Sequence, residues 1–247
     1  MKTLFACDLD NTLLIPRRER QDGDVCAEIL NGTEQSFLTS GTPALLRELV
    51  RSENVIFLPV TTRSREQYER IDLTVSPRYA LICNGLSLLD SGELYDEWER
   101  EFAPVVRKHL PEAERLFSKY SGLDGLTSLR LVDGKFLFAA FSDVDIAARR
   151  FSEFSRETSL DIALSGRKIY WLPPGADKGT AVRRFAEMFD CERIVAAGDS
   201  SIDLPMLDIA DVALVPDSGL AGMCKCHDVR VCAGERFPDH ILGNVIL

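Results

Sequence analysis

Two aspartates stand two positions apart where an apolar segment of the chain ends. Residues 4–7 are apolar or small, Asp8 and Asp10 follow, and the turn-prone pair Asn11-Thr12 comes next. This pattern predicts a short strand that gives way to a turn. Two carboxylates at a strand end can divide the work of phosphoryl transfer, because one attacks phosphorus and the other handles the leaving-group proton. Taken alone, the pair is equally well explained as solvated aspartates at a strand-to-turn junction.

Three further stretches of the chain carry side chains that phosphoryl transfer needs. The apolar segment 55–60 ends at Thr61, and another apolar segment ends shortly before Asp199 and Asp203. Lys178 opens a stretch whose apolar residues have helical spacing. In an open α/β sheet, ligands bind at the edge formed by the carboxyl ends of the strands. We therefore expect the hydroxyl, the lysine and the carboxylates to meet at one edge.

These four stations resemble the motifs of the haloacid dehalogenase (HAD) superfamily, which consists mostly of Mg²⁺-dependent phosphatases. The matching residues are Asp8-Leu9-Asp10-Asn11-Thr12, Thr61, Lys178 and Gly198-Asp199-Ser200-Ser201-Ile202-Asp203. Residues 81–85 and the long insert after them are similar to the branch whose cap lies between the second and third motifs. That branch includes sugar phosphatases. The likeness covers roughly residues 1–85 and 172–247.

Two residues depart from the pattern of that branch. Asn11 and Thr62 stand where it usually has glycine. Asparagine tolerates the left-handed backbone that glycine adopts, so the first departure is mild. The second places a side chain near the phosphate site, where we expect it to affect the choice of substrate.

The resemblance implies a catalytic role for four residues. Asp8 would be the nucleophile, and Asp10 would be the general acid and then the base that activates water. Thr61 would hydrogen-bond the phosphoryl group, and Lys178 would hold its charge and stabilise Asp8. Structural alternatives remain open at this point. Thr61 could be an ordinary β-branched residue at a strand end, and Lys178 a solvated residue at a helix start, where its charge is mildly unfavourable.

The resemblance also implies a magnesium site. Its protein ligands would be the carboxylates of Asp8 and Asp199 and the backbone carbonyl of Asp10, a set that suits a small hard cation. Asp203 would stand beside the metal and Lys178, or would cap the helix expected from residue 204, or both.

The substrate would meet residues of two groups. Near the phosphate we expect Thr62 and Arg63, although a surface salt bridge is as good an account of Arg63. Asn84 and Gly85 would line the entry, by resemblance. On the insert, three polar residues could contact the substrate: Ser128, Arg130 and Lys168. They could also belong to a sheet face that is exposed to solvent.

The order of the expected elements predicts an α/β protein with two parts. A Rossmann-like parallel-sheet core would comprise residues 1–85 and 173–247, with a flap hairpin near 22–39 that turns at Asn31-Gly32. Residues 86–172 would form a smaller α+β cap. Its expected helices are 103–120 and 142–158, the latter capped by Ser142, and its expected strands are 126–132, 135–141, 160–164 and 167–172. Whether the hairpin is a flap beside the nucleophile or a surface ornament stays open.

The composition limits the classes of binding partner that we expect for this chain. The formal net charge of the 247 residues is −10, which argues against a general binder of nucleic acid or anionic membranes. No apolar run is long enough to span a bilayer, and the first residues lead directly into a strand without a signal-peptide profile, so we expect a cytoplasmic protein. The seven cysteines are expected to be reduced. A zinc site built from Cys224, Cys226 and Cys232 has no common ligand spacing, and loop thiols are the better interpretation.

The leading hypothesis is therefore a Mg²⁺-dependent phosphomonoester hydrolase that forms an aspartyl phosphate and acts on a small, sugar-like phosphate. The closest rival is a phosphomutase acting on a hexose phosphate, and a third possibility is a non-catalytic binding protein of the same fold.

Overall fold

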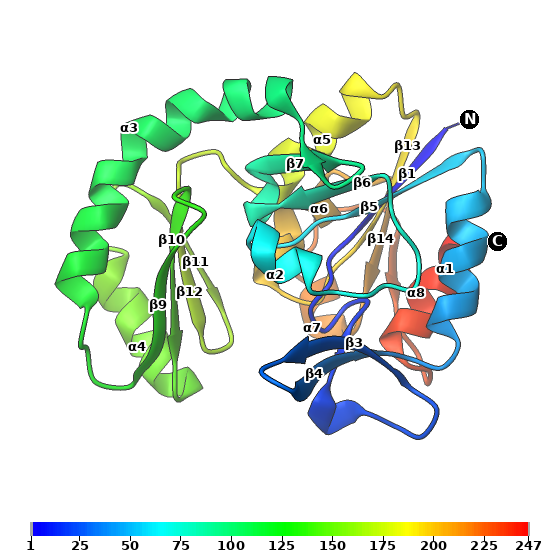
Figure 1. Ribbon diagram of the computed structural model, residues 1–247, viewed down its shortest axis with the longest axis horizontal. Coiled ribbons are helices and arrows are strands. Elements are labelled where there is room, and N and C mark those ends of the chain that lie inside the picture. The colour runs from blue at the N-terminus through cyan, green and yellow to red at the C-terminus, as the bar shows by residue number, and fades with distance from the viewer. Residues whose placement is uncertain (1, 247) are drawn as a thin grey trace.

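Five parallel strands form the central sheet, in the spatial order β15-β14-β13-β1-β5 (Figure 1). The computed structural model describes residues 2–246. Most residues of the three middle strands are buried, as expected for a parallel sheet covered on both faces. The strands run over Thr3–Cys7 (β1), Val55–Pro59 (β5), Arg193–Ala197 (β13), Val212–Val215 (β14) and Val229–Val231 (β15). The predicted α/β class with a parallel sheet is confirmed.

Helices cover both faces of this sheet. Alternate residues of β1 enter opposite cores: Phe5 and Cys7 pack with α1 and α8, whereas Leu4 and Ala6 pack with α5 and α6. The helices of the two layers are α1 (Thr42–Arg51), α8 (Phe237–Ile246), α5 (Lys178–Met188) and α6 (Leu204–Asp208). Two short helices, α2 (Arg65–Glu69) and α7 (Ser218–Ala221), follow β5 and β14.

The predicted hairpin is present. Strands β3 (Val25–Leu30) and β4 (Thr33–Leu38) pair antiparallel around a turn at Asn31 and Gly32, both of which have positive φ. The short β2 (Ile15–Pro16) adds a third strand beside β4. Ala27 and Leu38 pack into the core cluster that contains Phe5, so the hairpin rests on the parallel-sheet unit.

The segment after residue 85 stays with the core for a further stretch. Strands β7 (Ser87–Asp90) and β8 (Glu93–Leu94) extend β6 (Tyr79–Ile82) into an antiparallel sheet. Leu88 and Trp98 lie in the same cluster as Leu4 of β1. These contacts, which include Trp98, favour a start of the cap after residue 98 rather than at 86; the division into core and cap remains a proposal.

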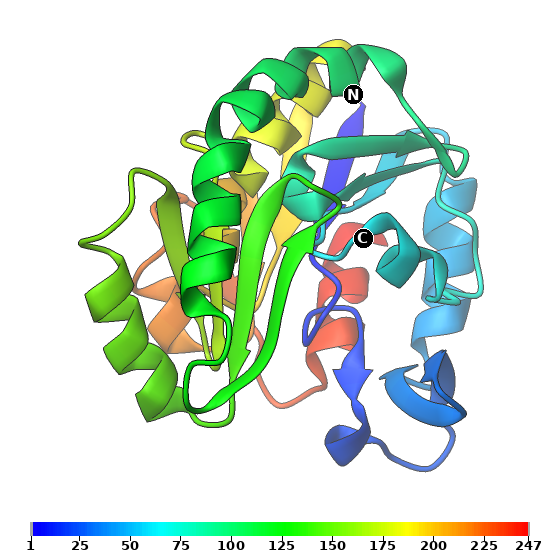
Figure 2. The same cartoon turned by 60° about the vertical axis from the view of Figure 1, so that its left-hand side comes forward.

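The rest of the insert forms a four-stranded antiparallel sheet, ordered β11-β12-β10-β9, with two helices on one face (Figures 1 and 2). The strands are β9 (Leu126–Val132), β10 (Phe136–Phe141), β11 (Asp161–Ser165) and β12 (Lys168–Leu172), and the helices are α3 (Asp96–Tyr120) and α4 (Val144–Phe154). The α+β composition expected for this segment is confirmed. Both tryptophans, Trp98 and Trp171, are fully buried.

Both helices of the insert differ from expectation in their limits, and α4 ends at Phe154 rather than at residue 158. Helix α3 begins at Asp96, seven residues before the predicted start, because a cluster of acidic residues in its first turn suits the positive end of a helix even without apolar periodicity. Helix α4 is capped by Asp143, whose side chain accepts from the N–H groups of Asp145 and Ile146, and not by Ser142.

Candidate active site

A buried lysine joins two of the aspartates at the carboxyl edge of the sheet. Asp8 directly follows β1, and its N–H donates to the carbonyl of Ala197 in β13 (3.0 Å). Lys178 is the first residue of α5, whose N-terminus is capped by Asp177. Its ammonium group donates to Asp8 Oδ1 and Asp203 Oδ1, each at 2.6 Å. A fully buried lysine at a helix start is unfavourable by itself, so these two carboxylates account for its position.

Carboxylates outnumber cations in this region by two charges. Oxygens of Asp8, Asp199 and Asp203 lie within 4.8 Å of one another around the single Lys178. Burial raises the pKa of Asp8 despite the lysine, and burial together with Asp203 raises the pKa of Asp199 to about 7. Burial alone would lower the pKa of Lys178, but Asp203 and Asp8 raise it, so the lysine stays charged. The electrostatic repulsion in this region therefore acts on the carboxylates, which exceed the cations by two charges.

This donor set fits a hard divalent cation such as Mg²⁺. All the side-chain donors are carboxylate oxygens, and the two excess negative charges equal the charge of one Mg²⁺ ion. Within residues 2–246, the carboxylate of Asp199 accepts a single long hydrogen bond, from Asn11 (3.4 Å). Asn11 has a φ of 62°, which confirms that this position takes the left-handed backbone expected of it.

Asp203 differs from the other carboxylates because both of its oxygens already have partners. Oδ1 accepts from Lys178, and Oδ2 accepts from the N–H groups of Asp199 and Ser200 and from the Ser200 hydroxyl. Its side chain makes no cap bond to α6, so the expectation that it caps the helix from residue 204 is wrong. Asp203 instead closes the turn that carries Asp199, and it fits a positioning role better than that of a metal ligand.

Thr61 lies at the same edge and is almost fully buried. Its N–H donates to the carbonyl of Leu81 (2.8 Å), and its hydroxyl accepts from the N–H of Arg63 (3.2 Å). The hydroxyl hydrogen is left free to donate to a bound group.

Asn84 and Gly85 do not line an entry, contrary to expectation. Asn84 is buried and donates from Nδ2 to the carbonyl of Ala176 (3.1 Å). A Cβ atom on Gly85 would lie 2.4 Å from the Cβ of Ala181 in α5, and its φ is +89°. Both residues therefore fasten the turn after β6 against the start of α5, where a larger residue than glycine does not fit.

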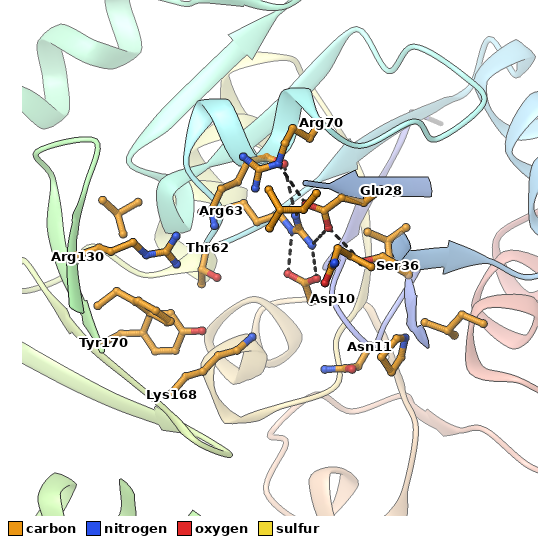
Figure 3. Close-up of a pocket in the computed structure, with 18 residues that line it drawn as sticks. Asp10, Asn11, Glu28, Ser36, Thr62, Arg63, Arg70, Arg130, Lys168 and Tyr170 are labelled. Carbon is orange, nitrogen blue, oxygen red and sulfur yellow. Dashed lines mark hydrogen bonds and ion pairs between the residues drawn. The ribbon is translucent and has the colours of Figure 1, made fainter. Parts of the chain in front are cut away.

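Arg63 bridges the second aspartate and the hairpin. Its guanidinium donates to both oxygens of Asp10 (3.0 and 2.7 Å) and to both oxygens of Glu28 in β3 (2.9 Å each), and more weakly to the carbonyl of Gln67 (3.4 Å; Figure 3). All five of its N–H groups are thereby used. The side chain is only 11% exposed, so the expected surface salt bridge is in fact a buried one, and no donor remains for a phosphate.

The ion pair sets the protonation of Asp10. Burial alone would raise the pKa of this carboxyl, but the charge and hydrogen bonds of Arg63, with smaller contributions from Lys168 and Lys178, lower it overall. Asp10 is therefore ionised near neutral pH in this arrangement, the form that accepts a proton from water.

A cavity of about 280 Å³ opens beside Asp10 and separates the core from the insert (Figure 3). It is small for a ligand pocket, which suits a small ligand. From the core side it is lined by Asp10, Asn11, Thr62 and Arg63, and from the hairpin by Glu28 and Ser36. The hairpin thus borders the candidate site and is not an ornament remote from it.

The four-stranded sheet supplies the opposite wall. Arg130, Tyr170 and Lys168 extend from it toward Asp10 (Figure 3), whereas Ser128 does not line the cavity. Ser128 faces the same side as Arg130, but it lies one row further along the sheet. Of the three substrate-contact residues expected on the insert, the structure therefore places two at the cavity.

Sequence reasoning missed Glu28, Arg70 and Tyr170. Glu28 was recognisable as the one charged residue within the otherwise apolar or small run of β3, yet its partner lies 35 positions away.

Among the described residues, no metal-ligand cluster includes Cys224, Cys226 or Cys232. No helix of residues 2–246 combines the length and apolar character needed to cross a bilayer.

Comparisons with known proteins give the same fold. No family model matches the chain. A stretch of 114 residues, 45% of this chain, is 34% identical to a phosphoglycolate phosphatase of Methanothrix thermoacetophila. The match spans 47% of that relative, or about half of its length.

Two solved structures match almost the whole chain. The sucrose-phosphatase of Synechocystis sp. PCC6803, in complex with sucrose and phosphate, has a TM-score of 0.66 at 15% identity and covers 99% of this chain and 97% of its own. A haloacid dehalogenase-like hydrolase from B. subtilis has a TM-score of 0.59 at 16% identity, with 100% and 99% covered. The resemblance to HAD phosphatases is confirmed at the level of the fold.

Proposed function

We propose that this chain is a Mg²⁺-dependent phosphomonoester hydrolase that acts through an aspartyl phosphate on a small, sugar-like phosphate. The observation that carries the proposal is the pairing of Asp8, buried against Lys178, with Asp10 on the cavity side of the same strand end. The names of the relatives, sucrose-phosphatase and phosphoglycolate phosphatase, support a small phosphorylated substrate.

The two aspartates take successive roles in the proposed reaction. Asp8 attacks phosphorus, and the bond from phosphorus to the substrate oxygen breaks. Asp10, which Arg63 keeps ionised in the free site, takes up a proton when the negatively charged substrate binds beside it, and gives this proton to that oxygen. Asp10, now ionised, takes a proton from water as the water attacks the phosphoaspartate, and this step releases inorganic phosphate and restores Asp8. Lys178 offsets the charge of Asp8 throughout, and Thr61 donates its hydroxyl to the phosphoryl group.

The metal site would consist of the carboxylates of Asp8 and Asp199 and the backbone carbonyl of Asp10. When bound there, Mg²⁺ supplies positive charge to the phosphoryl oxygens. Asp203 orients the Asp199 turn through the hydrogen bonds to Oδ2 and holds Lys178 through Oδ1.

The decisive experiment is phosphate release from a panel of phosphorylated metabolites, with Mg²⁺ or with EDTA. We expect release that requires Mg²⁺ and disappears in Asp8→Asn. Asp145→Asn is the matched control, because Asp145 is an exposed residue of the first turn of α4. Formation of an isomeric phosphate with little free phosphate would instead identify a phosphomutase. Binding without turnover would identify a non-catalytic protein.

A further inference from the structure

Two cations of the cavity wall have no anionic partner. Arg130 in β9 and Lys168 in β12 make no ion pair with any side chain of the described residues, although both line the cavity. Arg130 only lies over the ring of Phe138, with its guanidinium carbon 4.7 Å from the ring centroid. This is unusual in a chain that carries a formal charge of −10, since acidic partners are plentiful elsewhere on its surface.

The other charges of the cavity compensate one another. Its two carboxylates, Asp10 and Glu28, are engaged by two cations, Arg63 and Arg70; the Arg70–Glu28 distance is 3.5 Å. Arg130 and Lys168 are therefore an excess of two positive charges in the wall. Burial lowers the pKa of Arg130, and repulsion from Arg70 and Arg63 lowers it further, whereas Tyr170, Asp10 and Asp8 raise the pKa of Lys168. A bound anion would relieve that repulsion.

The geometry of the sheet directs both side chains at the same space. Arg130 stands opposite Phe138, and Phe138 stands opposite Tyr170, so these three form one cross-strand row. Lys168 lies two residues before Tyr170 and so shares its face. Strand spacing and rise put the Cα atoms of Arg130 and Lys168 about 12 Å apart, within reach of one small ligand for two long side chains.

The reacting phosphoryl group does not need these cations. Lys178 contacts Asp8, and together with an Mg²⁺ ion at the proposed site it would supply positive charge to a phosphoryl group on Asp8. Arg130 and Lys168 line the cavity beside Asp10, whereas Asp8 and Lys178 do not, so the cavity is where the leaving group of a phosphate bound at Asp8 would lie.

We propose that the substrate carries a second anionic group on its leaving part, a carboxylate or another phosphate, and that Arg130 and Lys168 bind this group. The inference rests on the proposed function and narrows its substrate class to phosphorylated acids or bisphosphates. Phe138 and Tyr170, which lie between the two cations, would contact the carbon skeleton that joins the two anionic groups.

Pairs of related esters, of which one member carries a second anionic group, test this proposal. Suitable pairs are gluconate 6-phosphate with glucose 6-phosphate, glycerate 3-phosphate with glycerol 3-phosphate, and fructose 1,6-bisphosphate with fructose 6-phosphate. For at least one pair we expect a higher kcat/KM for the member that carries the second anionic group. The expected difference is about tenfold or more, the range of a charge-assisted hydrogen bond. The first two pairs report a carboxylate and the third a phosphate.

Single variants then assign the preference to residues. Arg130→Gln and Lys168→Met should each reduce the ratio within the preferred pair by about tenfold, and Arg130→Lys should restore part of it. Arg167→Gln is the matched control: Arg167 precedes Lys168 but does not line the cavity, so its ratio should equal that of the wild type.

Equal kcat/KM within all three pairs would overturn the inference while leaving the phosphatase proposal intact. An equal loss on both members of the preferred pair would also overturn it, because the cations would then bind the reacting phosphoryl group. If no ester is hydrolysed, the proposed function fails. Calorimetric binding of gluconate 6-phosphate against glucose 6-phosphate then decides the inference separately: tighter binding of the acid supports it, and equal binding refutes it.

Discussion

Replacing Lys178 with methionine tests the electrostatics of the site most directly. The lysine is fully buried and is the shared hydrogen-bond donor of Asp8 and Asp203, at 2.6 Å from each. Methionine retains most of the side-chain volume and removes the charge. Asp203 keeps three hydrogen bonds to its other oxygen, but Asp8 loses Lys178, the one cation among the described residues that pairs with it. Two buried carboxylates are then left without a counter-charge.

Removing one partner of a buried ion pair costs about 3–5 kcal/mol. For a chain of this size, which has a free energy of unfolding on the order of 5–15 kcal/mol, we expect Lys178→Met to lower the melting temperature by about 10 °C near pH 8. The deficit should shrink at pH 5. Burial already raises the pKa of Asp8 above its usual value, and removal of the lysine raises it further, so the penalty grows as pH rises and is relieved as Asp8 becomes protonated. The wild-type lysine keeps its stabilising charge throughout this interval, because its pKa is raised from an unfolded value of 10.5.

Thermal and urea unfolding at pH 5 and pH 8, without metal, measure this effect. Lys119→Met is the control, because the Lys119–Glu157 pair is nearly half exposed and should contribute less than about 1 kcal/mol. A Lys178→Met protein as stable as wild type at pH 8 would refute the reasoning. So would a deficit that stays the same at both pH values.

Three further outcomes follow from the site. Because the pKa of Asp199 is raised to about 7, protons should compete with Mg²⁺, and calorimetry should show affinity falling as pH drops from 8 to 6. Arg63→Gln should raise the pKa of Asp10, so kcat/KM for an alkyl phosphate should extend to higher pH; p-nitrophenyl phosphate, whose leaving group needs no proton, should show no such extension. Gly179→Ala should cost about 1–3 kcal/mol in urea unfolding, because the new Cβ would lie 2.2 Å from the carbonyl oxygen of Pro205; unchanged stability would contradict the packing described.

The parts of the site that lie at strand ends could be predicted from the sequence. An apolar run followed by Asp8 is a local pattern, and the same is true of the run before Asp199. The rule that carboxyl ends of parallel strands share an edge then brings them together without knowledge of the strand order. Lys178 was found in the same way, from helical periodicity beginning at a polar residue.

The contacts between distant segments could not be predicted. The Asn31-Gly32 turn identified the hairpin, because turn chemistry is local. Which residue of the hairpin meets Arg63 depends on how its strands sit on the core, and β3 carries two register irregularities that shift its side chains. The burial of Asn84 likewise depends on the approach of α5, which lies nearly a hundred positions further along the chain.

Arg63 shows how a contact between distant segments changes the role expected of a residue. As an isolated motif residue it is a natural phosphate ligand, since it lies two positions beyond Thr61 and carries a charge. In the folded chain Glu28 takes two of its N–H donors and Asp10 takes two more, so Arg63 serves to orient a carboxylate. Glu28 and Asp10 share one guanidinium, and the orientation of the Asp10 carboxylate therefore depends on a residue of the hairpin. In the proposed reaction, a segment outside all four motifs would thus help to determine how Asp10 meets the leaving oxygen.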